Sequence, residues 1–166
     1  MLDKNSIVFI NIPLSIPPHR GFEHIIELEE GAKPVITTPY SHTKRFKEEI
    51  ENMIQELLEK GWIRPSSSPF ASSVVLVKKN GTLQVCVDYH ALEKKTIKNR
   101  YPIPRINELL DELHGALYFF KIDLHSRYHQ IYMRDGDVEN TTFHCHYEHY
   151  EFLVMSFSLT NALATF

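Results

Sequence analysis

The sequence predicts an α+β fold in which antiparallel strands pack against helices. Three features predict it: an amphipathic pattern over residues 42–60, two apolar runs joined at Asn80–Gly81, and further short strand patterns after residue 115. Helices and strands in this order, without regular βαβ units, are typical of an antiparallel sheet with packed helices. With 166 residues, of which 43% are hydrophobic, the chain has the size of one domain with its own core.

Composition excludes several classes of protein. The net charge of −3 gives no global basic field, and no apolar run approaches the length of a membrane span. Cys86 and Cys145 form neither a disulfide framework nor a zinc-binding Cys-x-x-Cys pair. The N-terminus lacks the pattern of a signal peptide. We therefore expect an intracellular protein with no membrane span and no disulfide-linked partner.

The first 40 residues carry five of the nine prolines. Proline fixes φ and lacks an N–H group, so this part is expected to be extended or looped. The apolar residues Ile25, Ile26 and Leu28 predict one short strand within it.

The clearest element is a helix over residues 42–60. Ser41 is the expected N-cap, because its side chain can accept a bond from a free N–H group, and Gly61 is the expected left-handed stop. Apolar residues recur at helical spacing on one face: Phe46, Ile50, Met53, Ile54, Leu57 and Leu58.

A hairpin follows, with strands near 74–77 and 83–87. Its turn contains Asn80–Gly81, a strong hairpin signal because both turn residues need positive φ. The prolines and serines of residues 65–69 mark the loop before it.

The second half predicts shorter elements. A helix is expected over 105–114, ended by Gly115, with an inward face of Ile106, Leu109, Leu110 and Leu113. Strands are expected over 117–122, 141–145 and 150–155, and a helix begins near residue 160.

Several side chains could carry chemistry, and the residues alone leave their roles open. Asp123 follows an apolar strand, where a carboxylate can hold a hard cation but can equally cap a helix or a loop. The basic segment 94–105 could contact phosphates or be a solvated loop.

Two other patterns argue against metal sites. His144, Cys145, His146 and His149 match no tetrahedral zinc spacing, so we expect a solvated hairpin face. The Asp135–Gly136–Asp137 run lacks the rest of a calcium loop, so we expect a surface turn.

Read as strings, parts of the chain resemble the reverse transcriptase of Gypsy-type LTR retrotransposons. The strings, in order, are GWIRPSSSPF (61–70), VDYHAL (87–92), KNRYPIPR (98–105), KIDLHSRYHQI (121–131), YEFLVM (150–155) and LTNALATF (159–166). The resemblance extends from about Pro17 to Phe166.

The resemblance implies an incomplete right-hand polymerase, with fingers and the first part of the palm. It divides the chain into an extended N-terminal flank (1–35), fingers (36–97), the start of the palm (98–130), a fingers return segment (131–160) and the start of the next palm helix (161–166). It also implies template-primer RNA or DNA, deoxynucleoside triphosphates and Mg²⁺ as partners.

Site residues follow from the same resemblance. Asp123 matches the first metal-binding aspartate, and Leu124 would offer a backbone carbonyl to the same metal. Tyr128 matches the bulky residue that excludes a sugar 2′-hydroxyl. Lys78 or Lys79 matches a triphosphate-contacting lysine, and Phe157 matches a nucleotide-pocket position. The basic segment 94–105 would contact nucleic acid through Lys94, Lys95, Lys98, Arg100 and Arg105.

The chain also departs from the family pattern. The family has arginine at Gln84 and glycine at Arg127, and both positions belong to the nucleotide site. The family's paired aspartates would lie beyond Phe166. We therefore expect a truncated retrotransposon-derived reverse transcriptase that is inactive as this chain alone. Two alternatives stay open: an active polymerase completed by further sequence, and a non-catalytic nucleic-acid-binding or interaction module.

Overall fold

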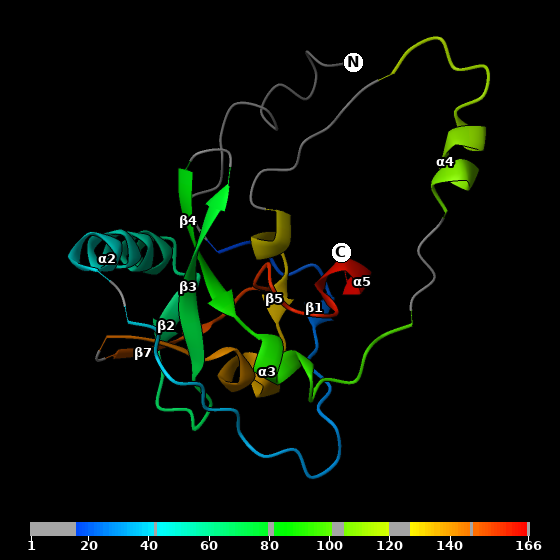
Figure 1. The fold of residues 1–166 in the computed structure, drawn as a ribbon. Coiled ribbons are helices and arrows are strands. Elements are labelled where there is room, and N and C mark those ends of the chain that lie inside the picture. Colours follow the sequence, from blue (N-terminus) through cyan, green and yellow to red (C-terminus); the bar gives the residue numbers. More distant parts are fainter. Residues whose placement is uncertain are drawn as a thin grey trace.

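A computed structural model describes residues 16–41, 43–79, 82–100, 105–119, 127–146 and 148–165 (Figure 1). Its helices are α2 (Lys44–Glu59), α3 (His90–Glu93), α4 (Ile106–Glu112) and α5 (Ala162–Thr165), with 3₁₀ segments η2 (Arg127–Gln130) and η3 (Asp135–Thr141). Its strands are β1 (Glu23–His24), β2 (Ile63–Pro65), β3 (Ser72–Lys79), β4 (Thr82–Asp88), β5 (Tyr132–Met133), β6 (Phe143–Cys145) and β7 (Glu148–Phe152). The predicted α+β class is confirmed.

Helix α2 confirms the amphipathic pattern. Ile50, Ile54 and Leu57 are buried on its inner face. Gly61, at a φ of 68°, ends the helix as predicted, and its N–H donates to the carbonyl of Leu58. The predicted cap was wrong, because the helix begins at Lys44 and the N-cap position falls on Thr43, which makes no side-chain cap bond.

A five-stranded sheet forms the centre, in the order β2-β7-β6-β3-β4. The predicted hairpin is confirmed: β3 and β4 pair antiparallel, with Lys79 opposite Thr82. The strands predicted over 141–145 and 150–155 correspond to β6 and β7, which pair antiparallel and lie between β2 and β3. The β3–β6 contact is parallel. Neither β2 nor α3 was predicted, and their shortness explains the omission.

The N-terminal flank joins the body through a second, two-stranded sheet. Strand β1 pairs parallel with β5. The predicted strand was displaced, because β1 covers Glu23–His24 and not Ile25 or Ile26. The N–H of Ile26 instead donates to the Asp137 carboxylate at 3.0 Å, so it has a side chain as its partner.

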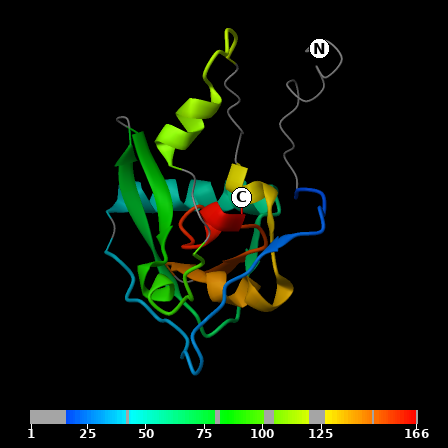
Figure 2. The ribbon, with the colours of Figure 1, turned by 90° about the vertical axis from the view of Figure 1, so that its right-hand side faces the viewer.

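Helix α4 forms as predicted but its predicted packing is wrong. The exposed fractions of its apolar side chains are 74% for Ile106, 47% for Leu109, 58% for Leu110 and 47% for Leu113. Figure 1 shows α4 set apart from the sheet, and in the view of Figure 2 it lies near the upper ends of β3 and β4. Periodicity predicts the helix, but a buried face also needs a partner, and no side chain of α4 is buried among the described residues.

The strand predicted over 117–122 is also wrong where it can be checked. Residues 117–119 form no strand, and Leu117 and Tyr118 are 86% and 85% exposed. Residues 120–122 lie outside the described residues. No helix in the described part of the chain is long and apolar enough to cross a membrane.

Candidate functional site

Two aromatic rings from distant parts of the chain meet beside β4. Tyr128 comes from η2, and Phe157 lies in the turn that follows β7. Their ring centroids are 5.0 Å apart and the ring planes cross at 89°, a favourable edge-to-face contact. Phe157 is 62% exposed and Tyr128 is half-buried, so the pair presents an aromatic surface to solvent.

Backbone bonds fix both ends of this pair. The N–H of Ile131 donates to the carbonyl of Tyr128, and the N–H of Met155 donates to the carbonyl of Ile131 at 2.8 Å. The Ser158 hydroxyl donates to the carbonyl of Val87 at 2.8 Å, which attaches the Phe157 turn to β4. The rings are therefore held by three connected segments.

Other residues predicted for this site are only partly described. Lys78 and Lys79 lie at the end of β3, and Gln84 lies on β4 opposite Val77. Arg127 begins η2, next to Tyr128. The side chains of these four residues lie outside what the structure describes, as do Asp123 and Leu124 as a whole. The structure thus brings together Tyr128 and Phe157 and leaves the predicted metal ligands undescribed.

The basic segment is extended and largely exposed over residues 97–100. Lys94, Lys98 and Arg100 are exposed, whereas the Lys95 ammonium donates to the carbonyl of Lys33 at 2.8 Å. Residues 101–104 lie outside the described residues, and Arg105 sits beyond them as the exposed N-cap of α4. Lys95 therefore attaches the start of this segment to the N-terminal flank.

A side-chain amide that was not predicted as functional holds this segment. Asn161 accepts a bond from the N–H of Asn99 at 3.0 Å and donates to the carbonyl of Ile97 at 2.9 Å. One amide thus pairs with the backbone as a neighbouring strand would. The link joins the segment to the start of α5, which no local sequence signal reveals.

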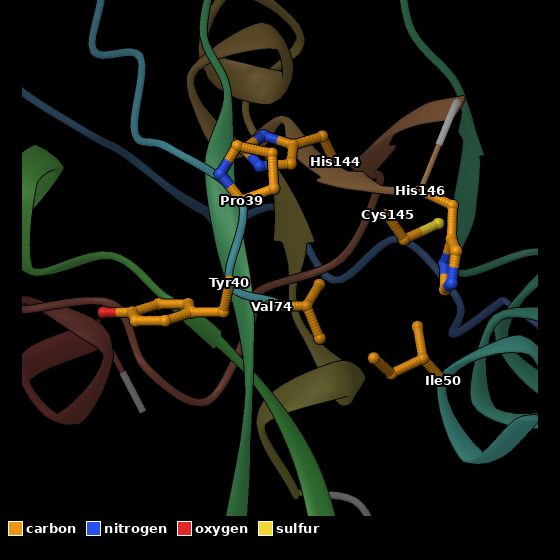
Figure 3. A pocket seen from close by; sticks show the side chains of 7 residues that line it. All are labelled: Pro39, Tyr40, Ile50, Val74, His144, Cys145 and His146. Carbon is orange, nitrogen blue, oxygen red and sulfur yellow. The ribbon is translucent and has the colours of Figure 1, made fainter. Parts of the chain in front are cut away.

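The histidine-rich hairpin differs from its prediction. His144 is 8% exposed, so the expected solvated face is wrong at this position. It borders a small pocket with Pro39, Val74 and Cys145 (Figure 3), and burial together with nearby His149 lowers its pKa. The side chain of His144 lies next to Pro39 (Figure 3). The alternation of side chains along a short hairpin does not predict such a contact with a distant segment.

The Cys145 side chain lies in surroundings that disfavour its ionised form. Burial, with Glu148 and Glu51 nearby, raises the pKa of the Cys145 thiol to about 11, so the thiolate that a metal needs is disfavoured. Across the described ranges, no group of three or more His, Cys, Asp or Glu side chains could hold a metal ion.

Asp137 is not the surface residue that was predicted. It is 5% exposed, and its carboxylate accepts a bond from the N–H of Ile26 and pairs with Arg134 at 2.9 Å. Asp135 and Gly136 remain exposed, as a surface turn requires. The carboxylate therefore anchors the N-terminal flank.

Comparison with solved structures shows which class of fold this is. The structure resembles a foamy virus protease–reverse transcriptase with a TM-score of 0.79 over 97% of this chain, at 17% identity and over 22% of that chain. A foamy viral protease–reverse transcriptase solved in complex with an RNA/DNA hybrid gives a TM-score of 0.77 over the same 97%, at 16% identity and over 22% of its length. The fold is that of a reverse transcriptase.

Sequence comparison leads to the same class. The chain is 37% identical over 150 residues, 87% of its length, to the retrovirus-related Pol polyprotein from transposon 297 of Drosophila melanogaster. It is 37% identical over 81% of its length to that from transposon gypsy, and 53% identical over 51% of its length to an RNA-directed DNA polymerase homolog of Oenothera berteroana. No family model matches the chain.

These relatives identify the chain as a reverse transcriptase-related retrotransposon sequence. The match covers 14% of each of the two Drosophila polyproteins and 60% of the Oenothera protein. The chain thus spans a small part of the length of the Pol polyproteins that it matches.

Proposed function

We propose that this chain supplies the fingers and the first part of the palm of an RNA-directed DNA polymerase. The contact between Tyr128 and Phe157 is the observation that supports it best. A nucleotide pocket needs a flat, partly exposed apolar surface near the sugar, and this pair offers one between η2 and the turn after β7. The names of the relatives agree with this activity.

Tyr128 would exclude a ribose 2′-hydroxyl by the bulk of its ring. Its edge-to-face contact limits the ring's freedom, and a restrained ring rejects an extra oxygen better than a mobile one. Lys78 or Lys79 would contact the triphosphate. Gln84 and Arg127, which replace an arginine and a glycine of the family pattern, would weaken nucleotide binding, because a neutral amide cannot substitute for a charged contact to phosphate.

A divalent metal belongs to the chemistry of the reverse transcriptase family, and Mg²⁺ is the ion that we propose. Asp123 and the backbone carbonyl of Leu124 would hold it, because both are the oxygen donors that a hard cation prefers. When bound in such a polymerase, the metal stabilises the charge that develops during nucleotidyl transfer. The 166 residues contain no two consecutive aspartates. We therefore expect this polypeptide on its own not to extend a primer.

The basic segment would bind the template-primer. Lys98 and Arg100 are exposed on a backbone that Asn161 holds, so their charges are presented from a fixed base. The foamy viral protease–reverse transcriptase, which shares this fold, has been solved in complex with an RNA/DNA hybrid, and this supports nucleic acid as the partner. The same segment would serve a non-catalytic nucleic-acid-binding module, which is the second candidate function.

Binding of an RNA/DNA hybrid tests this part of the proposal. Fluorescence anisotropy at several salt concentrations should show tighter binding at low salt, because each contacted phosphate releases counterions. Lys98→Ala combined with Arg100→Ala should reduce the slope of log K against log salt by about two. Lys44→Ala with Lys47→Ala removes two exposed charges from α2 and should leave the slope unchanged. Equal effects of the two double variants would contradict an interface at the basic segment.

A further inference from the structure

A second stack of side chains also includes a residue of η2, His129. The rings of Trp62 and His129 are 4.4 Å apart and inclined by 20°, and His129 also stacks on Phe152 with centroids 6.2 Å apart. The Lys60 ammonium lies 4.7 Å from the centroid of the Trp62 ring. His129 thus stacks against two aromatic rings, one at the end of β7 and one just before β2.

Trp62 gives this stack a rigid base. The residue is 5% exposed. Its backbone N–H donates to the carbonyl of Leu57 at 3.0 Å, and its backbone carbonyl accepts a bond from the N–H of Leu153 at 2.9 Å. Among the described side chains, the buried indole nitrogen Nε1 of Trp62 has no hydrogen-bond partner. The indole is therefore held by packing and by its backbone, and its stacking partner is His129.

Tyr128 and His129 are consecutive residues of one short 3₁₀ turn. With three residues per turn, consecutive side chains leave the axis about 120° apart, so one turn can present one ring to each of two surfaces. Tyr128 meets Phe157 on one side, and His129 meets Trp62 on the other. A displacement of His129 would therefore rotate the turn and move the Tyr128 ring.

We propose that His129, held by the indole of Trp62, is the positioning residue that fixes the ring of Tyr128 against Phe157. It thereby sets the sugar discrimination of Tyr128, and this last step alone rests on the proposed function. His129 acts here as a flat ring and not as an acid or base. Burial, together with the nearby charge of Lys60, lowers its pKa to about 4, so the ring is neutral at physiological pH.

The first experiment asks whether the stack exists in solution. Trp62 is the single tryptophan of the chain, so the tryptophan emission of the full 166-residue protein reports on it alone. A protonated imidazole quenches an indole on which it stacks. Emission should therefore fall with a midpoint near pH 4 in the wild type, and this step should be absent in His129→Phe, which keeps a ring but cannot be protonated. An identical acid step in both proteins would overturn the proposal.

The second experiment asks whether the stack positions Tyr128. NMR spectra of tyrosine-labelled protein are recorded at pH 7, and the Tyr128 signal is assigned from its loss in Tyr128→Phe. His129→Ala should shift the ring resonances of Tyr128, because these resonances lie in the ring current of Phe157. His129→Phe should restore them. His19→Ala, which removes a histidine stacked on Tyr132 at 4.0 Å, is the matched control and should leave them in place. Unmoved Tyr128 resonances in folded His129→Ala would show a purely structural stack and overturn the proposal.

These readouts need no nucleotide, so they separate this inference from the proposed function. A third readout is the preference for a deoxyribonucleotide over a ribonucleotide, measured once the rest of the palm is supplied. This preference should weaken in His129→Ala and recover in His129→Phe. If Tyr128→Ala itself leaves that preference unchanged, the proposed function of Tyr128 fails, whereas the ring positions reported by NMR still decide the role of His129.

Discussion

The Asp137 carboxylate offers a direct test of how the N-terminal flank is held. Its oxygens accept bonds from the N–H of Ile26 at 3.0 Å and from the amide of Asn140 at 3.3 Å, and they pair with Arg134. Asp137→Ala removes all three contacts and leaves the N–H of Ile26 without its partner. The flank should then lose its main polar attachment to η3.

The cost can be estimated from these contacts. A buried N–H group left without a partner costs about 1–3 kcal/mol. The ion pair with Arg134 adds little, because the side chain of Arg134 is 47% exposed and water screens the charges. The free energy of unfolding should therefore fall by about 1–3 kcal/mol. Asp137→Asn keeps an acceptor oxygen and should cost less than Asp137→Ala.

Urea unfolding of the full chain measures this difference. With an m value near 2 kcal/mol per molar, the midpoint for Asp137→Ala should fall by about 0.5–1.5 M. Asp135→Ala, in the same 3₁₀ segment but exposed, should stay within about 0.5 kcal/mol of the wild type. Equal midpoints for Asp137→Ala and Asp135→Ala would refute the anchoring role of Asp137.

Three further changes have clear expected outcomes. Ile50→Ala, at a side chain only 1% exposed, should cost about 2–5 kcal/mol of unfolding free energy, whereas Leu110→Ala on the exposed face of α4 should stay within about 0.5 kcal/mol. Asn161→Ala removes both the acceptor of the Asn99 N–H and the donor to the carbonyl of Ile97, so hydrogen exchange should become faster at the N–H of Asn99, while unchanged exchange would exclude the clamp. Burial lowers the pKa of His24 to about 4 in the folded chain from 6.5, although a nearby carboxylate opposes this. The stability that neutral His24 contributes is therefore fully present above pH 6.5 and is lost as the pH falls toward 4, by up to about 1.4 kcal/mol per pH unit. In urea unfolding, His24→Asn should flatten this dependence of the free energy of unfolding on pH.

Local patterns predicted the elements whose signals are local. The spacing of apolar residues predicted α2, and it did so correctly because these residues form the buried inner face of the helix. Asn80–Gly81 predicted the β3–β4 pairing. The same reasoning placed the inward face of α4 wrongly, since a period identifies a helix but not its partner. The burial of Asp137 was missed for a similar reason, because its partner Ile26 is distant in sequence.

The candidate site shows the same division. Family resemblance selected Tyr128 and Phe157 separately, and the structure adds that their rings are in contact. The clamp by Asn161 and the stack of His129 on Trp62 could not be predicted, because each depends on long-range packing that leaves no periodic signal. Asp123 remains a prediction from the resemblance.

The central claim is that Tyr128 belongs to the nucleotide site of a reverse transcriptase. It can be measured in a chimera that joins this chain to the remaining Pol sequence of a gypsy-type relative, in which Arg127→Gly and Gln84→Arg restore the family residues. Steady-state incorporation of a deoxyribonucleotide and of the matching ribonucleotide gives a ratio of kcat/KM values. We predict that Tyr128→Ala lowers this ratio by increasing ribonucleotide incorporation, while Tyr128→Phe preserves it. A ratio that Tyr128→Ala leaves unchanged in an active chimera would contradict the claim.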